Sequence, residues 1–87
     1  STARALAGVL ADLAATHQVI VVTHLAQVAV VADKHYVVSK EPGDVPQTHL
    51  DEVTGEARTA EIARMLSGDQ SEASLAHAKQ MLEEARG

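Results

Sequence analysis

Histidines are the side chains of this sequence best suited to chemistry near neutral pH, because their charge changes there. The five histidines stand at positions 17, 24, 35, 49 and 77, and no two have the H-x-x-x-H spacing that places two metal ligands on one helix face. No cysteine is present to complete a metal site, and the five glycines are isolated rather than gathered in a phosphate-binding loop. The pattern therefore predicts no metal site.

Only the pair Thr23 and His24 stands where a ligand is typically bound. The pair directly follows four β-branched residues, 19–22, and such an unbroken apolar run is typical of a strand covered on both faces in a parallel sheet. Ligands of these sheets bind beyond the carboxyl ends of the strands. An imidazole there can bond a polyanionic ligand or a water. The pattern alone nevertheless favours a structural histidine that ends the strand and bonds the next turn.

The elements that would hold this pair follow from periodicity and turn residues. Residues 2–16 have helical spacing, with an apolar stripe at Leu6, Val9, Leu10 and Leu13. Strand 18–23 follows, then a short helix over 25–32 and a second strand over 35–39. Residues 40–46 contain both prolines and form a loop, and 47–53 alternate as an antiparallel edge strand.

The last third of the sequence is predicted to be helical. A helix over 58–66 stops at Ser67 and Gly68, and Glu61 and Arg64 are spaced to pair on its surface. Asp69, with Glu72 three residues later, has the spacing of a capping box that starts a final helix.

Composition limits the classes of function. The 87 residues suffice for one small domain, with 46% hydrophobic residues but a single aromatic one. The net charge of -5 and the absence of a Lys/Arg cluster argue against nucleic-acid binding by this segment itself. No apolar run approaches the ~20 residues of a membrane span, and no signal-peptide pattern is present. The sequence opens in mid-helix, as though cut from a longer chain.

Two motifs resemble a known family. Residues 19–29, VIVVTHLAQVA, resemble the switch-histidine loop of ABC-type ATPases and, more narrowly, that of the RecN family of SMC-related bacterial DNA repair ATPases. Residues 61–68, EIARMLSG, are similar to a segment near the carboxyl terminus of that family. The resemblance covers essentially the whole chain. Ala26 stands where the family usually has proline, a difference that affects the stiffness of the turn after His24. Ser67 replaces a glycine, which is a mild change at a helix end.

The resemblance implies an α/β fold, the carboxyl-terminal part of an ABC/SMC-type P-loop ATPase head with a mainly parallel sheet flanked by helices. It divides residues 1–87 into the switch-histidine βα part (1–39), a variable loop and edge strand (40–55) and the carboxyl-terminal helices (56–87). It also implies that His24 contacts the γ-phosphate of ATP and helps position the attacking water, as phosphoryl transfer requires. Thr23 and Gln27 would frame that contact.

The resemblance further implies ATP and Mg²⁺ as cofactors, bound mainly by the Walker A, signature and Walker B motifs, which this sequence lacks. Residues 1–87 alone are therefore expected not to hydrolyse ATP. The implied partners are the amino-terminal half of the same head, a second head in a homodimer, and DNA through the parent protein, with no membrane. The implied setting is recombinational repair of double-strand breaks in the bacterial cytoplasm, at the nucleoid.

Two alternatives remain open from the sequence. The chain could be a head segment of another SMC-like ATPase, although Gln27 and the EIARML stretch argue against this. It could also be a small non-catalytic α/β interaction module in which His24 is structural.

Overall fold

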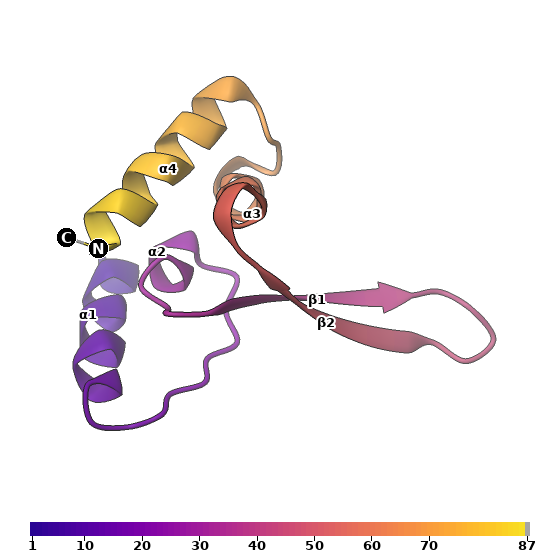
Figure 1. Ribbon diagram of the computed structural model, residues 1–87, viewed down its shortest axis with the longest axis horizontal. Helices are drawn as coiled ribbons and strands as arrows, with labels where there is room; N and C mark the ends of the chain where they lie inside the picture. The colour runs from indigo at the N-terminus through magenta and orange to yellow at the C-terminus, as the bar shows by residue number, and fades with distance from the viewer. Residues whose placement is uncertain (87) are drawn as a thin grey trace.

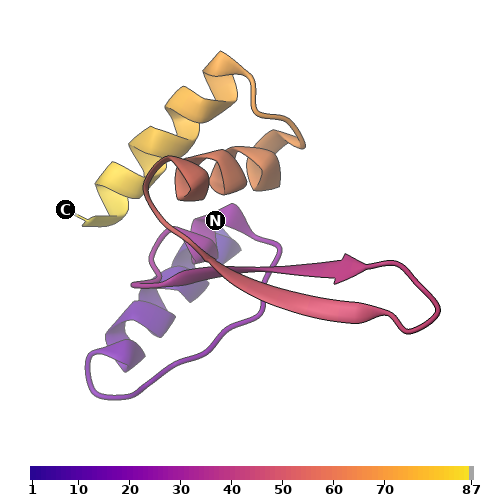
Figure 2. The same cartoon turned by 45° about the vertical axis from the view of Figure 1, so that its right-hand side comes forward.

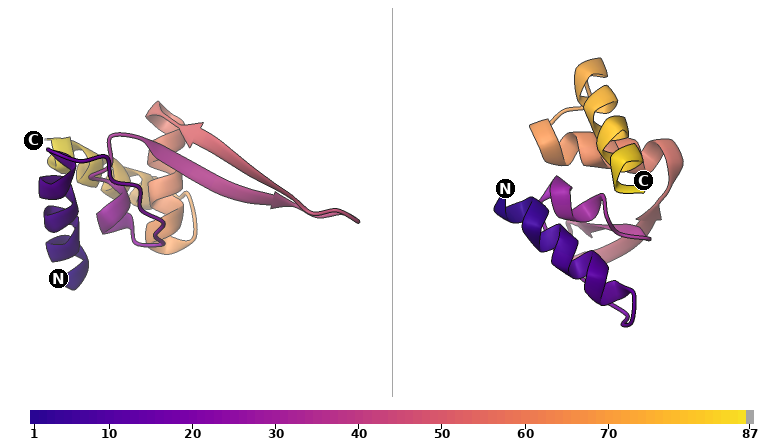
Figure 3. Two further views of the ribbon diagram at one scale, coloured as in Figure 1. Left: turned by 90° about the horizontal axis from the view of Figure 1, so that it is seen from below. Right: turned by 90° about the vertical axis from the view of Figure 1, so that its left-hand side faces the viewer.

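A computed structural model describes residues 1–86, which fold into helices and an antiparallel β-hairpin (Figure 1). In chain order the elements are α1 (Thr2–Ala14), α2 (Ala26–Ala29), β1 (His35–Glu41), β2 (Gln47–Val53), α3 (Gly55–Ser67) and α4 (Glu72–Arg86). The hairpin projects away from the helices, as Figure 2 and the left view of Figure 3 also show. The architecture is mixed α/β, as expected, but the sheet of this part of the chain has two antiparallel strands.

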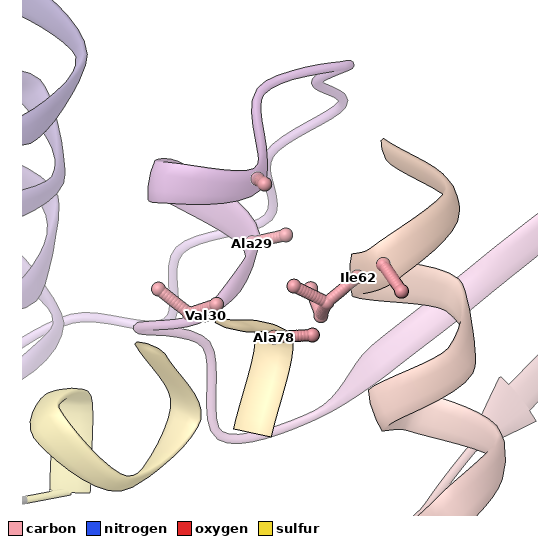
Figure 4. Packing of buried hydrophobic residues seen from close by; sticks show 6 residues of the cluster. Ala29, Val30, Ile62 and Ala78 are labelled. Carbon is pink, nitrogen blue, oxygen red and sulfur yellow. The ribbon is translucent and has the colours of Figure 1, made fainter. Parts of the chain in front are cut away.

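The core lies where α2, α3 and α4 meet. It is built from small side chains around one larger one, and Figure 4 shows Ala29 and Val30 facing Ile62, with Ala78 beside it. Ile62 is fully buried, and alanines on the neighbouring helices let the backbones approach it closely. The radius of gyration, 13.9 Å, exceeds the ~12 Å typical of a compact domain of this length. The fold is therefore an open one with a small core.

The two predicted strands of the hairpin are confirmed. Their register pairs His35 with Val53 at the base and Glu41 with Gln47 at the tip. β1 continues two residues beyond the predicted range 35–39 because Lys40 and Glu41 still pair with β2. The loop that contains both prolines then reverses the chain.

The prediction of a covered strand over residues 18–23 is wrong for this chain. The segment is not a strand, and no backbone hydrogen bond joins residues 18–24 to another segment within residues 1–86. Ile20 and Val22 are 84% and 95% exposed, whereas Val19 and Thr23 are half-buried. A strand needs a neighbouring strand to bond its backbone, and β1 pairs with β2 instead. No parallel sheet is formed by the described residues.

The predicted helix over residues 2–16 is confirmed as α1, two residues shorter, with Ser1 as its N-cap. Its apolar stripe does not face the core. Leu6, Val9 and Leu13 are exposed, and the buried residue of α1 is Ala7. The stripe is correctly periodic but has no partner surface among residues 1–86, because the core is on the far side of α2.

The ends of the two terminal helices follow local chemistry. Gly68 ends α3 with a φ of 78°, the left-handed conformation that suits glycine, and the Glu61–Arg64 pair forms as predicted. The predicted cap of α4 is displaced, because Ser71 rather than Asp69 accepts the hydrogen bond from the Ser74 amide. Asp69 instead accepts bonds from the Ser71 amide and neighbouring serine hydroxyls, and these donors lower its pKa.

Candidate functional site

The turn that carries His24 is held by its neighbours. The amide of Leu25 donates to the Thr23 hydroxyl oxygen, with N and Oγ1 3.0 Å apart, a local bond typical of Ser and Thr in turns. The amides of Val28 and Ala29 then donate to the Leu25 carbonyl, each at 3.1 Å, which starts α2. The turn and the short helix are thus one continuous hydrogen-bonded unit.

His24 itself is exposed at the tip of this turn. Within residues 1–86 its imidazole takes part in no side-chain hydrogen bond, unlike those of His17, which bonds Thr16, and His49, which bonds Glu41 at 3.0 Å. Both ring nitrogens of His24 are therefore open to a ligand. The alternative of a structural histidine expects this side chain to bond the following turn, and no such bond is present within residues 1–86. The turn is held by Thr23 instead.

Gln27 lies on α2, after the turn that carries the other two predicted site residues. It is exposed on α2 and borders a pocket of about 390 Å³ between α2, the start of α1 and α4. Arg4, His77 and Gln80 also line that pocket, whereas Thr23 and His24 do not. Gln27 thus lines this pocket, whereas Thr23 and His24 stand in the turn that precedes α2.

A cluster of polar residues that the sequence did not reveal lies at the other end of α2. Arg58 of α3 reaches back to α2, and its Nη2 donates to the carbonyls of Ala29 at 3.2 Å and Ala32 at 2.7 Å. The two carbonyls lie at the end of α2 and just past it, where an arginine side chain can supply a donor, and the Ala29 carbonyl also accepts the Ala32 amide at 3.2 Å. Contacts across 26 and 29 positions have no signature in the sequence, apart from an arginine two residues after Glu56, the acidic residue of the first turn of α3.

The base of β1 adjoins this cluster. His35 is half-buried beside Arg58 and Glu61, and burial lowers its pKa, with a further decrease caused by the Arg58 charge and an opposing increase caused by Glu61. Burial also lowers the pKa of Arg58, against the effect of Asp33, although a guanidinium stays charged. His35 Nδ1 and Arg58 Nε are buried without a hydrogen-bond partner.

Neither a metal-ligand group nor a membrane span is found in the described part of the chain. No three His, Cys, Asp or Glu side chains of residues 1–86 come together in a way that could hold a metal ion. None of the helices in those residues combines the length and apolar character needed to cross a bilayer.

Comparison with known proteins identifies the family, although no family model matches the chain. The chain is 51% identical to "DNA repair protein RecN" of Deinococcus radiodurans over 83 residues, which is 94% of this chain and 15% of that protein. It is 48% identical to the RecN protein of Treponema pallidum over 83 residues, 93% of this chain and 14% of that one. The corresponding match in Mycobacterium tuberculosis has 50% identity over 78 residues.

The chain thus spans only about one-seventh of the length of these relatives, as 13–15% of each is matched. The match nevertheless covers about nine-tenths of the chain itself, at identities of 36–51% across the relatives. Similarity of this extent includes the histidine turn, the hairpin and both terminal helices. The chain therefore belongs to the RecN family and corresponds to its carboxyl-terminal segment.

Proposed function

We propose that this chain forms the carboxyl-terminal part of the ATP-binding and ATP-hydrolysing head of a RecN-like protein that acts in recombinational repair of double-strand breaks. The observation that carries the proposal is its 51% identity, over nearly the whole chain, with a protein named for DNA repair. Residues 1–39 would provide the switch-histidine part, residues 40–55 the variable loop and edge strand, and residues 56–87 the supporting helices. The bacterial relatives favour a cytoplasmic setting at the nucleoid.

His24 would be the switch histidine of that head. Its exposed imidazole, with no partner within residues 1–86, is free to contact the γ-phosphate and to hold the attacking water in place. Positioning of this kind accounts for a large share of catalysis in phosphoryl transfer. Thr23 would shape the turn, and Gln27 would frame it from the short helix that follows.

ATP and Mg²⁺ would be held mainly outside this chain. Mg²⁺ would be bound mainly by the parts of the parent protein outside this chain, as the resemblance to the RecN family implies. His24 and Thr23 would contact the bound nucleotide from one side, and the rest of its contacts would come from the parent protein. ATP, when bound, supplies the phosphate group that is transferred to water.

The amino-terminal half of the same head is the partner that the exposed surface favours. Leu6, Val9 and Leu13 on α1, with Ile20 and Val22 on the extended segment, are apolar and open to solvent. Large apolar side chains exposed along two successive segments are what an interface would cover. Strands of the absent half would pair with residues 18–23 and complete a mainly parallel sheet, with a second head and DNA engaged by the parent protein.

The test is the substitution His24→Ala in the full-length parent protein, with His17→Ala and His77→Ala as controls. Removal of one pre-positioned contact to the reacting phosphate should lower kcat for ATP hydrolysis by about 10²-fold, with a much smaller change in ATP affinity. Both control variants should turn over at close to the wild-type rate. Wild-type turnover by the His24→Ala variant would favour the alternative of a non-catalytic interaction module.

A further inference from the structure

The starting observation is an unbroken series of hydrogen bonds from α3 to the histidine turn. Arg58 Nη2 donates to the Ala29 carbonyl at 3.2 Å, and the Ala29 amide donates to the Leu25 carbonyl at 3.1 Å. The Leu25 amide in turn donates to Thr23 Oγ1 at 3.0 Å. His24 is the residue between Thr23 and Leu25, which the last of these bonds joins. A single side chain of α3 is therefore connected to both residues that flank the imidazole.

The same guanidinium group also fixes the far end of α2. Its Nη2 makes a bond of 2.7 Å to the Ala32 carbonyl, just past the helix, so that one nitrogen joins two carbonyls three residues apart. A helix of four residues has no stability of its own and takes its position from what it packs against. Here that support is Arg58 together with the buried Ile62 and Ala63 of α3.

Arg58 is held there although the arrangement leaves a donor unsatisfied. Its Nε is buried without a partner, and so is Nδ1 of the adjacent His35. An unsatisfied buried donor is costly, and such exceptions in a fold call for an explanation. The bonds to α2 give one, since Nη2, at the end of a long side chain, reaches both carbonyls from α3.

We propose that Arg58 is a positioning residue that holds α2, and through it the Thr23–Leu25 turn, so that His24 is presented at a fixed place. The inference rests on the proposed function of His24 as the residue that contacts the reacting phosphate. Arg58 does not touch the nucleotide in this arrangement. Its effect on turnover passes through the position of the histidine turn.

The chain offers a matched control on the same helix. Arg64 lies nearly two turns after Arg58 along α3 and is exposed to solvent. Its Nε donates to the two carboxylate oxygens of Glu61 at 3.1 and 3.0 Å. Surface pairs at this spacing contribute little to stability. Arg64→Lys therefore changes the same residue type on the same element without touching α2.

The experiment measures ATP turnover by the full-length parent protein carrying Arg58→Lys, Arg64→Lys or His24→Ala, and by the double variant Arg58→Lys/His24→Ala. Arg58→Lys keeps the charge, but lysine Nζ is one bond closer to the backbone than arginine Nη2 and falls short of the two carbonyls. The variant should lower kcat about tenfold, as expected for a lost charge-assisted hydrogen bond, with KM for ATP within about twofold of wild type. Arg64→Lys should leave both unchanged. In the His24→Ala background, Arg58→Lys should have less than about a twofold further effect, because the residue through which it acts is gone.

Several results would overturn the inference. An equal fold-loss from Arg58→Lys with and without His24 would show that it acts independently of the histidine. A fall in the number of ATP-binding sites per protein that matches the fall in kcat would show a purely structural role. Unchanged turnover by Arg58→Lys, beside a strong loss in His24→Ala, would reject only the positioning role, whereas wild-type turnover by His24→Ala would reject the proposed function as well.

Discussion

The hydroxyl oxygen of Thr23 accepts a hydrogen bond from the backbone amide of Leu25 at 3.0 Å, so that the two bonded residues enclose His24. The bond is local, and it closes a turn at the point where an extended apolar segment meets α2. Because it uses the threonine side chain, the backbone of His24 is held while its imidazole stays free. The shape of the candidate site therefore depends on the hydroxyl group of the residue next to His24.

Replacement of Thr23 by valine, which has the same shape without the hydroxyl, should loosen this turn. One hydrogen bond contributes about 1 kcal/mol, so kcat for the ATP hydrolysis proposed for the parent protein should fall about fivefold, with little change in protein yield. Thr23→Ser keeps the acceptor oxygen and should retain most of the activity. Steady-state ATPase assays of both variants make the measurement. A larger loss in Thr23→Ser than in Thr23→Val would show that the methyl group, and not the hydroxyl, is what the site requires.

Substitution of Ile20 tests whether the rest of the head covers residues 18–23. Ile20 is 84% exposed in this chain, so Ile20→Ser would be nearly neutral if the surface stayed open. If absent strands cover it, the substitution should destabilise the parent protein by about 2 kcal/mol, the usual gain from burying such a side chain. Calorimetric unfolding of the parent protein measures this. Val45→Ser, at an equally exposed position in the hairpin loop, is the control and should be neutral.

The base of the hairpin should respond to pH through His35. Burial and the Arg58 charge lower the pKa of His35 below its ordinary value of 6.5, so the unfolded chain binds a proton more readily than the folded one. Stability should therefore be lost as the pH falls below 6.5, where the unfolded state takes up the proton first.

The measurement is the melting temperature of the parent protein between about pH 7.5 and about pH 5.5. His35→Gln, which cannot be protonated, should show a smaller decrease than wild type, and His17→Gln, at an exposed position, should behave as wild type. A decrease in melting temperature of the same size in all three proteins would mean that His35 does not contribute to the pH dependence of stability.

Local features of the fold were predictable because neighbouring residues determine them. The helix over 2–14, the two strands of the hairpin and the stop of α3 at Gly68 depend on periodicity, paired strands close in sequence and a left-handed glycine. The sequence also singled out Thr23 and His24, since a polar pair after an apolar run is visible without any structure.

Long-range contacts decided the rest. The apolar run 18–23 has strand character, but a strand exists only where another strand bonds its backbone, and within residues 1–86 none does. The bonds from Arg58 to Ala29 and Ala32 cross 29 and 26 positions, and no spacing rule links residues so far apart. Periodicity shows which side of a segment is apolar. Only the tertiary structure shows what that side meets, because packing and hydrogen bonding between distant segments depend on how the whole chain is brought together.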